Sequence, residues 1–288
     1  MDYKYGMIPQ GKLIAVGGAE DKGTDRDLYA VHKNNPNYTE LGVLKRIVDE
    51  AGGKHAHIEV VTTASSIPGE VWRNYLNAFT KLGCTRVFHM RIRKTKDAEQ
   101  EENIERLKTC RCIMFSGGNQ SKITSVFRDT EFFKILKHRY HVENFVVAGT
   151  SAGAMAMSHI MICDGNAAIS LLKGEVKNGI GLAFMENVII DSHVNKRGRF
   201  TRLAQMVALH PTKTGIGLSE DTGVIITNED ELEVIGSGAV MIVDGSAISY
   251  NNIKDIKDGS PISLENLKVH ILEMGNRYNC TTKKFIVR

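Results

Sequence analysis

Short runs of β-branched residues alternate with helix-like segments over the first two-thirds of the chain, and this alternation restricts the fold more than any other feature. Repeated βαβ units of this kind build a parallel sheet with helices on its faces. We predict strands over residues 12–16, 57–62, 85–90, 112–115 and 145–148, with helices over 41–51, 69–82 and 98–109.

The pattern changes after residue 187, where strand-like runs follow one another across short turns. These runs cover residues 188–190, 215–218, 223–227, 232–235, 240–243, 269–272 and 285–287, and one helix over 200–209 interrupts them. They predict antiparallel edge strands that complete a mostly parallel sheet. Because no repeat, linker or low-complexity tract divides residues 1–288, we expect a single doubly wound α/β domain.

Composition excludes several classes of protein. Apolar residues make up 42% of the chain and charged residues 24%, which is typical of a globular protein with a full core. The formal net charge of +4 is too small to indicate a nucleic-acid-binding protein. The uncharged stretch 145–163 is long enough to span a membrane, but its central glycine and hydroxyl residues favour a buried strand, turn and helix. We therefore expect neither nucleic acid nor membrane as a partner.

The cysteines and the N-terminus predict a cytoplasmic protein. An odd number of cysteines in a chain of this size favours a reducing compartment and buried free thiols. The first residues lack the basic and apolar regions of a secretory signal. Cys110 and Cys112 have no second pair at zinc-site spacing, so we expect no metal site, and nothing in the sequence indicates an organic cofactor.

The sequence Gly-Thr-Ser-Ala-Gly at 149–153 follows an apolar strand and precedes an Ala- and Met-rich stretch. This is the context of a G-x-S-x-G nucleophile elbow, in which a sharp turn exposes Ser151 Oγ. The following helix would direct its free N–H groups, beginning with Ala152, at an oxyanion. We expect this helix to continue past His159, whose ring would then lie roughly 12 Å along the axis, too far to act as the base.

Other strand ends carry further candidates. Gly118 could donate a second N–H group to the oxyanion, and Gln120 could orient the substrate. Among ten histidines, His193 follows the strand 188–190 directly and is the candidate base, while Glu220 and Asp221 follow the strand 215–218 and could each orient its ring. Ligands collect at the carboxyl ends of strands in open sheets, so the loops after residues 16, 115, 148, 190 and 218 should meet.

A basic run follows the candidate base. Residues 192–219 contain no Asp or Glu, whereas Lys196, Arg197, Arg199 and Arg202 fall within seven residues. Because arginine binds carboxylates through two parallel hydrogen bonds, this run indicates a pocket for an acidic substrate group. A solvated helix start is the alternative.

These motifs, in this order, resemble the cyanophycinase family, serine exopeptidases of the peptidase S51 group with a class I glutamine amidotransferase-like fold. The resemblance covers nearly the whole chain and rests on Gly-Gly-Ala-Glu at 17–20, Gly-Gly-Asn-Gln at 117–120, the elbow, Asp191-x-His193, Arg197, Arg199, Arg202, and Gly-Ile-Gly-Leu-Ser-Glu at 215–220.

The resemblance implies that Ser151 is the nucleophile, His193 the general base and Glu220 the orienting acid. It also implies that the substrate pocket is shaped by Gln120, Asp191, Arg197, Arg199 and Arg202. The implied substrate is cyanophycin, a polyaspartate with arginine on its side chains, which is cleaved through an acyl-enzyme to β-aspartyl-arginine dipeptides. The expected partner is thus a peptide-like chain rich in Asp and Arg; the oligomeric state is open, with a homodimer as one candidate.

Two positions depart from the family pattern. Ser192 stands where glutamine is expected before His193, and Asn119 stands where aspartate is expected in the glycine loop. Both bear on substrate fit rather than on the triad. Aspartyl dipeptidases of the same family share the elbow but take short α-linked substrates and lack the Arg-x-Arg-x-x-Arg run, so that run favours cyanophycinase.

Two other interpretations remain open from the sequence. An α/β-hydrolase-type esterase would use the order Ser151, Asp244, His270. A non-catalytic anion-binding module would use the glycine loops and arginines to hold its ligand, with Ser151 as a turn residue.

Overall fold

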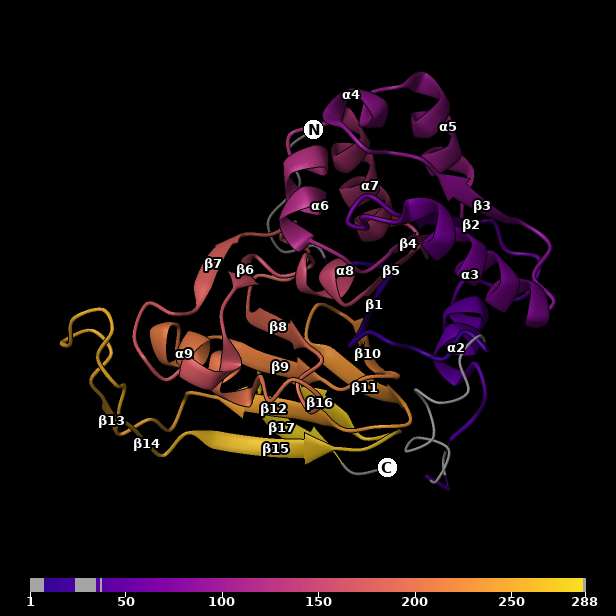
Figure 1. Cartoon of the computed structure of the whole chain (residues 1–288). Helices are drawn as coiled ribbons and strands as arrows, with labels where there is room; N and C mark the ends of the chain where they lie inside the picture. The colour runs from indigo at the N-terminus through magenta and orange to yellow at the C-terminus, as the bar shows by residue number, and fades with distance from the viewer. Residues whose placement is uncertain (1–7, 24–34, 37, 287–288) are drawn as a thin grey trace.

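The computed structural model describes residues 8–23, 35–36 and 38–286. Its largest sheet has nine strands in the order β17-β16-β11-β10-β1-β5-β4-β2-β3 (Figure 1). The last five strands in this order pair in parallel, which confirms the predicted parallel sheet. They are β1 (Lys12–Val16), β5 (Val146–Thr150), β4 (Cys112–Phe115), β2 (Ile58–Val61) and β3 (Val87–Met90).

Antiparallel strands complete one edge of this sheet, as predicted for the C-terminal part of the chain. β10 pairs antiparallel with β1, and β11, β16 and β17 follow in antiparallel order. Their bounds are β10 (Thr222–Thr227), β11 (Glu231–Gly236), β16 (Arg277–Asn279) and β17 (Lys284–Ile286).

Helices cover both faces of the parallel strands because side chains alternate between the faces. In β4, Cys112 and Met114 pack against α2 (Gly42–Glu50) and α3 (Pro68–Lys81). Ile113 and Phe115 face the opposite cluster, which includes side chains of the remaining helices in this half. These helices are α4 (Thr95–Ala98), α5 (Glu101–Thr109), α6 (Gln120–Phe127) and α7 (Glu131–Val142), of which α4, α6 and α7 had not been predicted.

A second sheet of four strands, in the order β15-β12-β9-β8, packs beside the antiparallel part of the first (Figure 1). α9 (Phe200–Leu209) covers its other face. We had expected all strands in one sheet, and this expectation was wrong for β8 (Val188–Ser192), β9 (Thr214–Leu218), β12 (Val240–Asp244) and β15 (Lys268–Leu272). The physical reason is that strand pairing joins distant segments, which the local apolar pattern does not specify.

The helix after the elbow is much shorter than predicted, since α8 covers only Ala152–Met155. The carbonyl groups of Ala156 and Met157 accept hydrogen bonds from Leu182 and Phe184 instead of continuing the helix. The chain then enters β6 (Ile160–Asp164), which pairs with β7 (Lys177–Ile180). The expectation that His159 lies on the same helix as Ser151 was therefore wrong.

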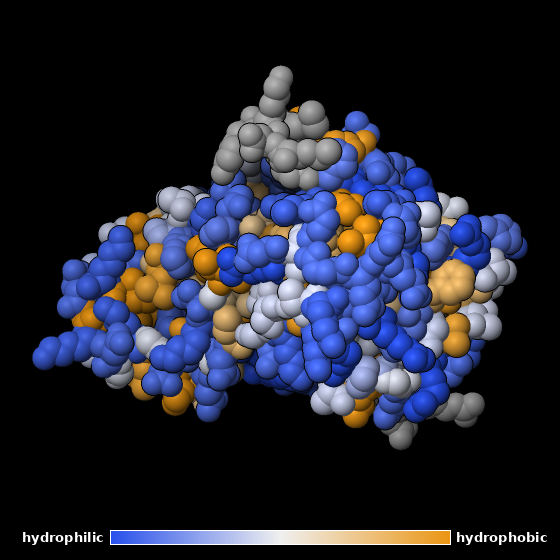
Figure 2. Space-filling view, turned by 90° about the horizontal axis from the view of Figure 1, so that it is seen from above, coloured by the Kyte–Doolittle hydropathy of each residue, from blue (hydrophilic) through white to orange (hydrophobic). Residues whose placement is uncertain are grey.

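The remaining elements are small. They are the 3₁₀ turn η1 (Ala167–Ile169) and the antiparallel pair β13 (Tyr250–Asn251) and β14 (Leu264–Glu265), which extends from one end of the molecule (Figure 1). Seen from above, the surface is mostly hydrophilic with scattered hydrophobic areas (Figure 2). Within the described ranges, the helices are all too short or too polar to cross a bilayer.

Candidate active site

Ser151 lies at the turn between β5 and α8, with a backbone conformation that few non-glycine residues adopt (φ 51°, ψ −110°). Its N–H group donates a 2.8 Å hydrogen bond to the carbonyl of Val16, which fixes the turn to β1. The glycines on either side are required by packing. A Cβ atom at Gly149 would lie 2.5 Å from the carbonyl carbon of Gly153, and one at Gly153 would lie 2.3 Å from the Phe115 carbonyl oxygen.

His193 comes to Ser151 from the end of β8. Its Nε2 atom lies 3.0 Å from Ser151 Oγ, and its Nδ1 atom lies 3.0 Å from Glu220 Oε1. The loop after β1 approaches the ring so closely that a Cβ atom at Gly18 would lie 2.5 Å from His193 Nε2. Three side chains from the ends of β5, β8 and β9 thus form one hydrogen-bonded chain, with the geometry of a serine, base and acid triad.

The structure separates the two carboxylates that follow β9. Glu220 faces His193, whereas Asp221 accepts hydrogen bonds from the Asp21 N–H group at 3.0 Å and from Ser237 Oγ at 2.7 Å. Asp221 therefore holds neighbouring loops together. Lys196 Nζ lies 3.9 Å from Glu220 Oε1, a neighbour that the sequence did not single out for this position.

Burial lowers the pKa of His193 below its ordinary value of 6.5. Glu220 acts in the opposite direction through its hydrogen bond, while the positive charge of Arg197 lowers this pKa further. The imidazole is therefore neutral at pH 7, which is the form that can accept a proton from Ser151.

We expect Arg197→Gln to move the acid limb of the pH profile of kcat/KM to higher pH. The side chain of Arg197 is exposed and its charge disfavours the protonated imidazole, so its removal raises the pKa of His193. Activity is lost as the pH falls through that pKa, because the protonated ring cannot act as a base. The profile of Arg86→Gln, which removes an exposed arginine at the opposite edge of the sheet, should be unchanged. A limb that stays in place or moves to lower pH in Arg197→Gln would contradict this electrostatic role.

Glu20 is a buried carboxylate beside the nucleophile, and its place in a Gly-Gly-Ala-Glu run is only an ambiguous signal in the sequence. It accepts hydrogen bonds from Thr150 Oγ1 at 2.6 Å and from the Tyr75 hydroxyl, and Lys22 Nζ lies 2.9 Å away. Burial would raise the pKa of Glu20, but Lys22 and the hydrogen bonds keep it below the ordinary value. Glu20 thereby anchors the residue before Ser151.

The glycine loop after β4 also reaches the nucleophile. A Cβ atom at Gly117 would lie 3.8 Å from Ser151 Oγ, and Gly118 packs on the Ala64 carbonyl with φ 142°. Because Gly117 has no side chain, the loop approaches Ser151 without filling the space in front of the hydroxyl. The N–H of Ala152 belongs to the first turn of α8, where helical N–H groups lack intrahelical partners. The oxyanion roles of Gly118 and Ala152 stay predictions.

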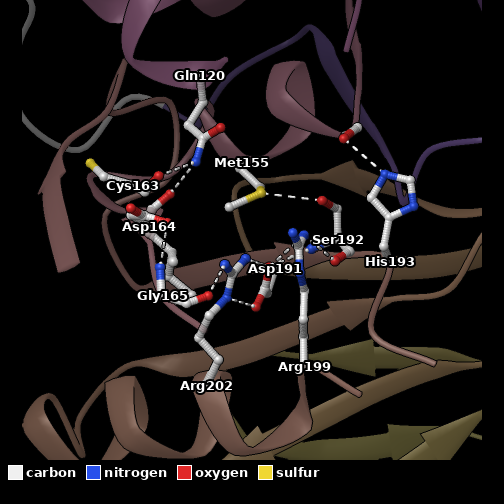
Figure 3. A network of polar contacts seen from close by, with 12 residues as sticks. Gln120, Met155, Cys163, Asp164, Gly165, Asp191, Ser192, His193, Arg199 and Arg202 are labelled. Atoms are coloured by element: carbon white, nitrogen blue, oxygen red, sulfur yellow. Dashed lines mark hydrogen bonds and ion pairs between the residues drawn. The ribbon is translucent and has the colours of Figure 1, made fainter. Parts of the chain in front are cut away.

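Two residues of this loop hold structure together. Gln120 Nε2 donates to the carbonyls of Ile162 and Cys163 at 2.7 and 3.0 Å, which ties α6 to β6 (Figure 3). Asn119 Oδ1 accepts from the Ser121 N–H at 2.9 Å and caps α6. Aspartate can make the same cap, so the departure at this position preserves the local structure.

Asp191 and Arg202 form a buried ion pair below the site (Figure 3). Arg202 Nε and Nη2 lie 2.8 and 2.5 Å from the two carboxylate oxygens, and Nη1 donates to the Gly165 carbonyl at 3.2 Å. The sequence predicted a bidentate contact between arginine and an acidic substrate group, but Arg202 makes this contact with Asp191 of the protein itself. Arg202 can act on substrate only by positioning its neighbours.

The other two arginines differ in exposure. Arg199 is partly buried and donates to the Ser192 carbonyl at 3.0 Å, and burial together with the nearby charge of Arg202 lowers its pKa to about 10. Arg197 is exposed. Ser192, the second departure from the family pattern, directs its hydroxyl to Met155 Sδ at 3.2 Å (Figure 3).

The alternative hydrolase triad is not assembled. Asp244 binds Ser246, and the His270 ring packs beside Tyr278 with ring centroids 5.6 Å apart. His159 pairs with Glu186 at 3.3 Å. In the part of the chain that the structure describes, no three His, Cys, Asp or Glu side chains are grouped as metal ligands would be.

This fold, with a serine, histidine and glutamate in hydrogen-bonded sequence at the edge of its sheet, is that of a serine hydrolase. Comparisons with known proteins narrow the class. Residues 32–235 match the sequence profile described as peptidase family S51, and the chain belongs to that family.

Two relatives agree with this assignment, and a solved structure has a similar fold. The chain is 33% identical over 273 residues to a cyanophycinase of Geminocystis herdmanii, covering 95% of each chain. It is 31% identical over 267 residues to a cyanophycinase of Trichormus variabilis, covering 93% of this chain and 85% of that one. The fold is similar to the crystal structure of a peptidase from an acI-B1 actinobacterium, with a TM-score of 0.66 and 21% identity over 96% of this chain and 100% of that chain.

Proposed function

We propose that this chain, as a single α/β domain, is a serine exopeptidase that hydrolyses cyanophycin to β-aspartyl-arginine dipeptides. The observation that carries the proposal is the contact between Ser151 Oγ and His193 Nε2 at 3.0 Å, continued to Glu220. Membership of peptidase family S51 and similarity to cyanophycinases over nearly the whole chain support the substrate.

In the proposed mechanism, His193 takes the proton of Ser151 as Oγ attacks an aspartyl backbone carbonyl. The N–H groups of Gly118 and Ala152 stabilise the oxyanion. His193 then protonates the leaving amine, and Glu220 stabilises the imidazolium through Nδ1. A water molecule, deprotonated by His193, attacks the acyl-enzyme and releases the product.

The basic run would receive the acidic groups of the substrate. Arg197 is exposed and Arg199 is partly exposed, so both could direct N–H groups toward a substrate carboxylate, and Arg199 Nη1 also lies 3.9 Å from Asp191 Oδ1. Asp191 and Arg202 would fix this arrangement from below, and Gln120 would do so from the side of β6.

Incubation with purified cyanophycin tests the proposal most directly. We expect β-aspartyl-arginine to be the main product by chromatography and mass spectrometry, with the polymer shortened progressively. An aspartyl dipeptidase would instead cleave short α-linked aspartyl dipeptides and leave the polymer intact. Failure to release dipeptides from cyanophycin would contradict the proposed substrate.

We also propose that the protein acts in the cytoplasm. All five cysteines are free thiols, and burial raises the pKa of Cys110 to about 12, so this thiol resists ionisation and oxidation. These features support a reducing compartment.

The small net charge of +4 supports a partner other than nucleic acid.

A further inference from the structure

A cavity of about 360 Å³ lies at the carboxyl ends of β2 and β3. Its wall is rich in arginine and includes Thr62, Trp72, Arg73, His89, Arg91 and Arg93. All three arginines are exposed, and no carboxylate belongs to the described residues that line the cavity. We call Trp72, Arg73, Arg91 and Arg93 the basic pocket.

The floor of the basic pocket is an aromatic stack. The rings of Trp72 and His89 lie 5.1 Å apart and within 10° of parallel. His89 Nε2 contacts Thr62 Oγ1 at 2.8 Å, and Nδ1 accepts from Arg91 Nε at 3.3 Å, which requires a neutral ring. Burial and the surrounding arginines lower the pKa of His89 to about 4.

The basic pocket is physically connected to the active site. Arg93 Nη1 donates to the carbonyls of Thr62 and Ser65, both at 3.0 Å. Between them, the Ala64 carbonyl accepts from the Asn119 N–H at 3.0 Å, in the glycine loop that reaches Ser151. Two loops joined by a hydrogen bond thus connect the basic pocket to the nucleophile.

The strand order gives the distance between the two sites. β5, which ends directly before Ser151, is separated from β3 by three steps across the sheet. With neighbouring strands about 4.8 Å apart, the separation is roughly 14 Å. An extended chain advances about 3.3–3.6 Å per residue, so roughly four residues span it.

We propose that the basic pocket binds a segment of the polymeric substrate about four aspartyl units away from the bond being cleaved. This inference rests on the proposed function. Each arginine of the polymer is joined to an aspartyl side chain through its α-amino group, which leaves one carboxylate and one guanidinium free. The carboxylates pair with Arg73 and Arg91, and a guanidinium stacks on Trp72.

Steady-state kinetics on a long and a short substrate test this inference. The variant is Arg73→Glu/Arg91→Glu, and the short substrate is a dimer of β-aspartyl-arginine units, which cannot reach the basic pocket. We expect the KM for cyanophycin to rise about tenfold, since two ion pairs become repulsive contacts. The kcat for cyanophycin, and both constants for the dimer, should remain those of the unmodified protein.

The matched control reverses two charges at the opposite, amino-terminal end of the parallel strands. Arg86→Glu/Arg111→Glu changes exposed residues just before β3 and β4, so its KM for cyanophycin should stay unchanged. Binding of both variants to immobilised cyanophycin, measured in a Ser151→Ala background, gives a second readout without turnover. Only the variant of the basic pocket should bind more weakly.

Two results would overturn the inference, and they are distinguishable. Equal KM values for the two double variants, with cyanophycin hydrolysis intact, would show that the basic pocket does not bind the polymer. The proposed function would not be affected. If the unmodified protein releases no dipeptides from cyanophycin, both the proposed function and the role of the basic pocket are refuted. A rise in KM for the dimer equal to that for the polymer would show a general effect on the active site and would also count against the basic pocket.

Discussion

Ser151→Ala is expected to lower kcat for cyanophycin by roughly 10⁴- to 10⁶-fold, as in other serine enzymes that lose their nucleophile. The hydroxyl lies 3.0 Å from His193 Nε2, and alanine leaves the base without an oxygen to activate. The change removes one atom at a turn whose backbone is held by glycines and by the Val16 carbonyl, so the fold should be retained. Purified variant and unmodified protein are compared by release of dipeptides over time.

A neighbouring serine provides the control for this experiment. Ser192 is buried and its hydroxyl contacts Met155 Sδ, so Ser192→Ala should keep kcat within a few-fold of the unmodified protein. Labelling with a fluorophosphonate, read by mass spectrometry, should modify Ser151 in the unmodified protein and in Ser192→Ala. Near-normal hydrolysis by Ser151→Ala, or an unlabelled Ser151, would refute the catalytic role and favour an anion-binding module.

Asp191→Ala is expected to destabilise the fold by about 3–5 kcal/mol, because it leaves the guanidinium of Arg202 buried without its counter-charge. Both side chains are almost fully inaccessible, and Asp191 accepts two hydrogen bonds from Arg202. Thermal unfolding followed by circular dichroism should show a Tm lowered on the order of 10 °C. The effect arises from one unpaired charge, not from a lost surface contact.

Two further variants test this explanation. Lys134→Ala removes a surface pair with Glu131, whose side chains are mostly exposed, and should leave the Tm nearly unchanged. Asp191→Ala/Arg202→Leu removes both buried charges and should recover part of the lost stability. If the double variant has a lower Tm than Asp191→Ala, the unpaired charge is not the cause of the lost stability.

The fold shows which local patterns suffice for prediction. The strand over 112–115 and the helix over 200–209 were predicted with the bounds that the structure has, because the first is a short continuous apolar run and the second repeats apolar residues at helical spacing. The helices α6 and α7 were missed, although Asn119 and Thr130 cap them and are visible as cap residues in the sequence. The end of α8 was not predictable in this way, since it depends on pairing with residues after Gly181.

The candidate site also has parts that the sequence could predict and parts that only the structure shows. Ser151 and His193 could be proposed from the sequence because each follows a strand whose end must lie at the ligand-binding edge of the sheet. Their positions after a strand left both Glu220 and Asp221 as candidates for the orienting acid, and the family resemblance favoured Glu220. Their different orientations result from the turn after β9, where Asp221 adopts φ 47° and is bound by Ser237.

The sequence alone determined the βα alternation, the elbow and the positions of the strand ends, because these depend on residues close together in the chain. The tertiary structure decided that β8 and β9 belong to a second sheet, that Arg202 binds Asp191, and that a basic pocket lies beside β3. These features depend on which distant segments become neighbours. That choice follows from burial and charge pairing over the whole core, which no local pattern records.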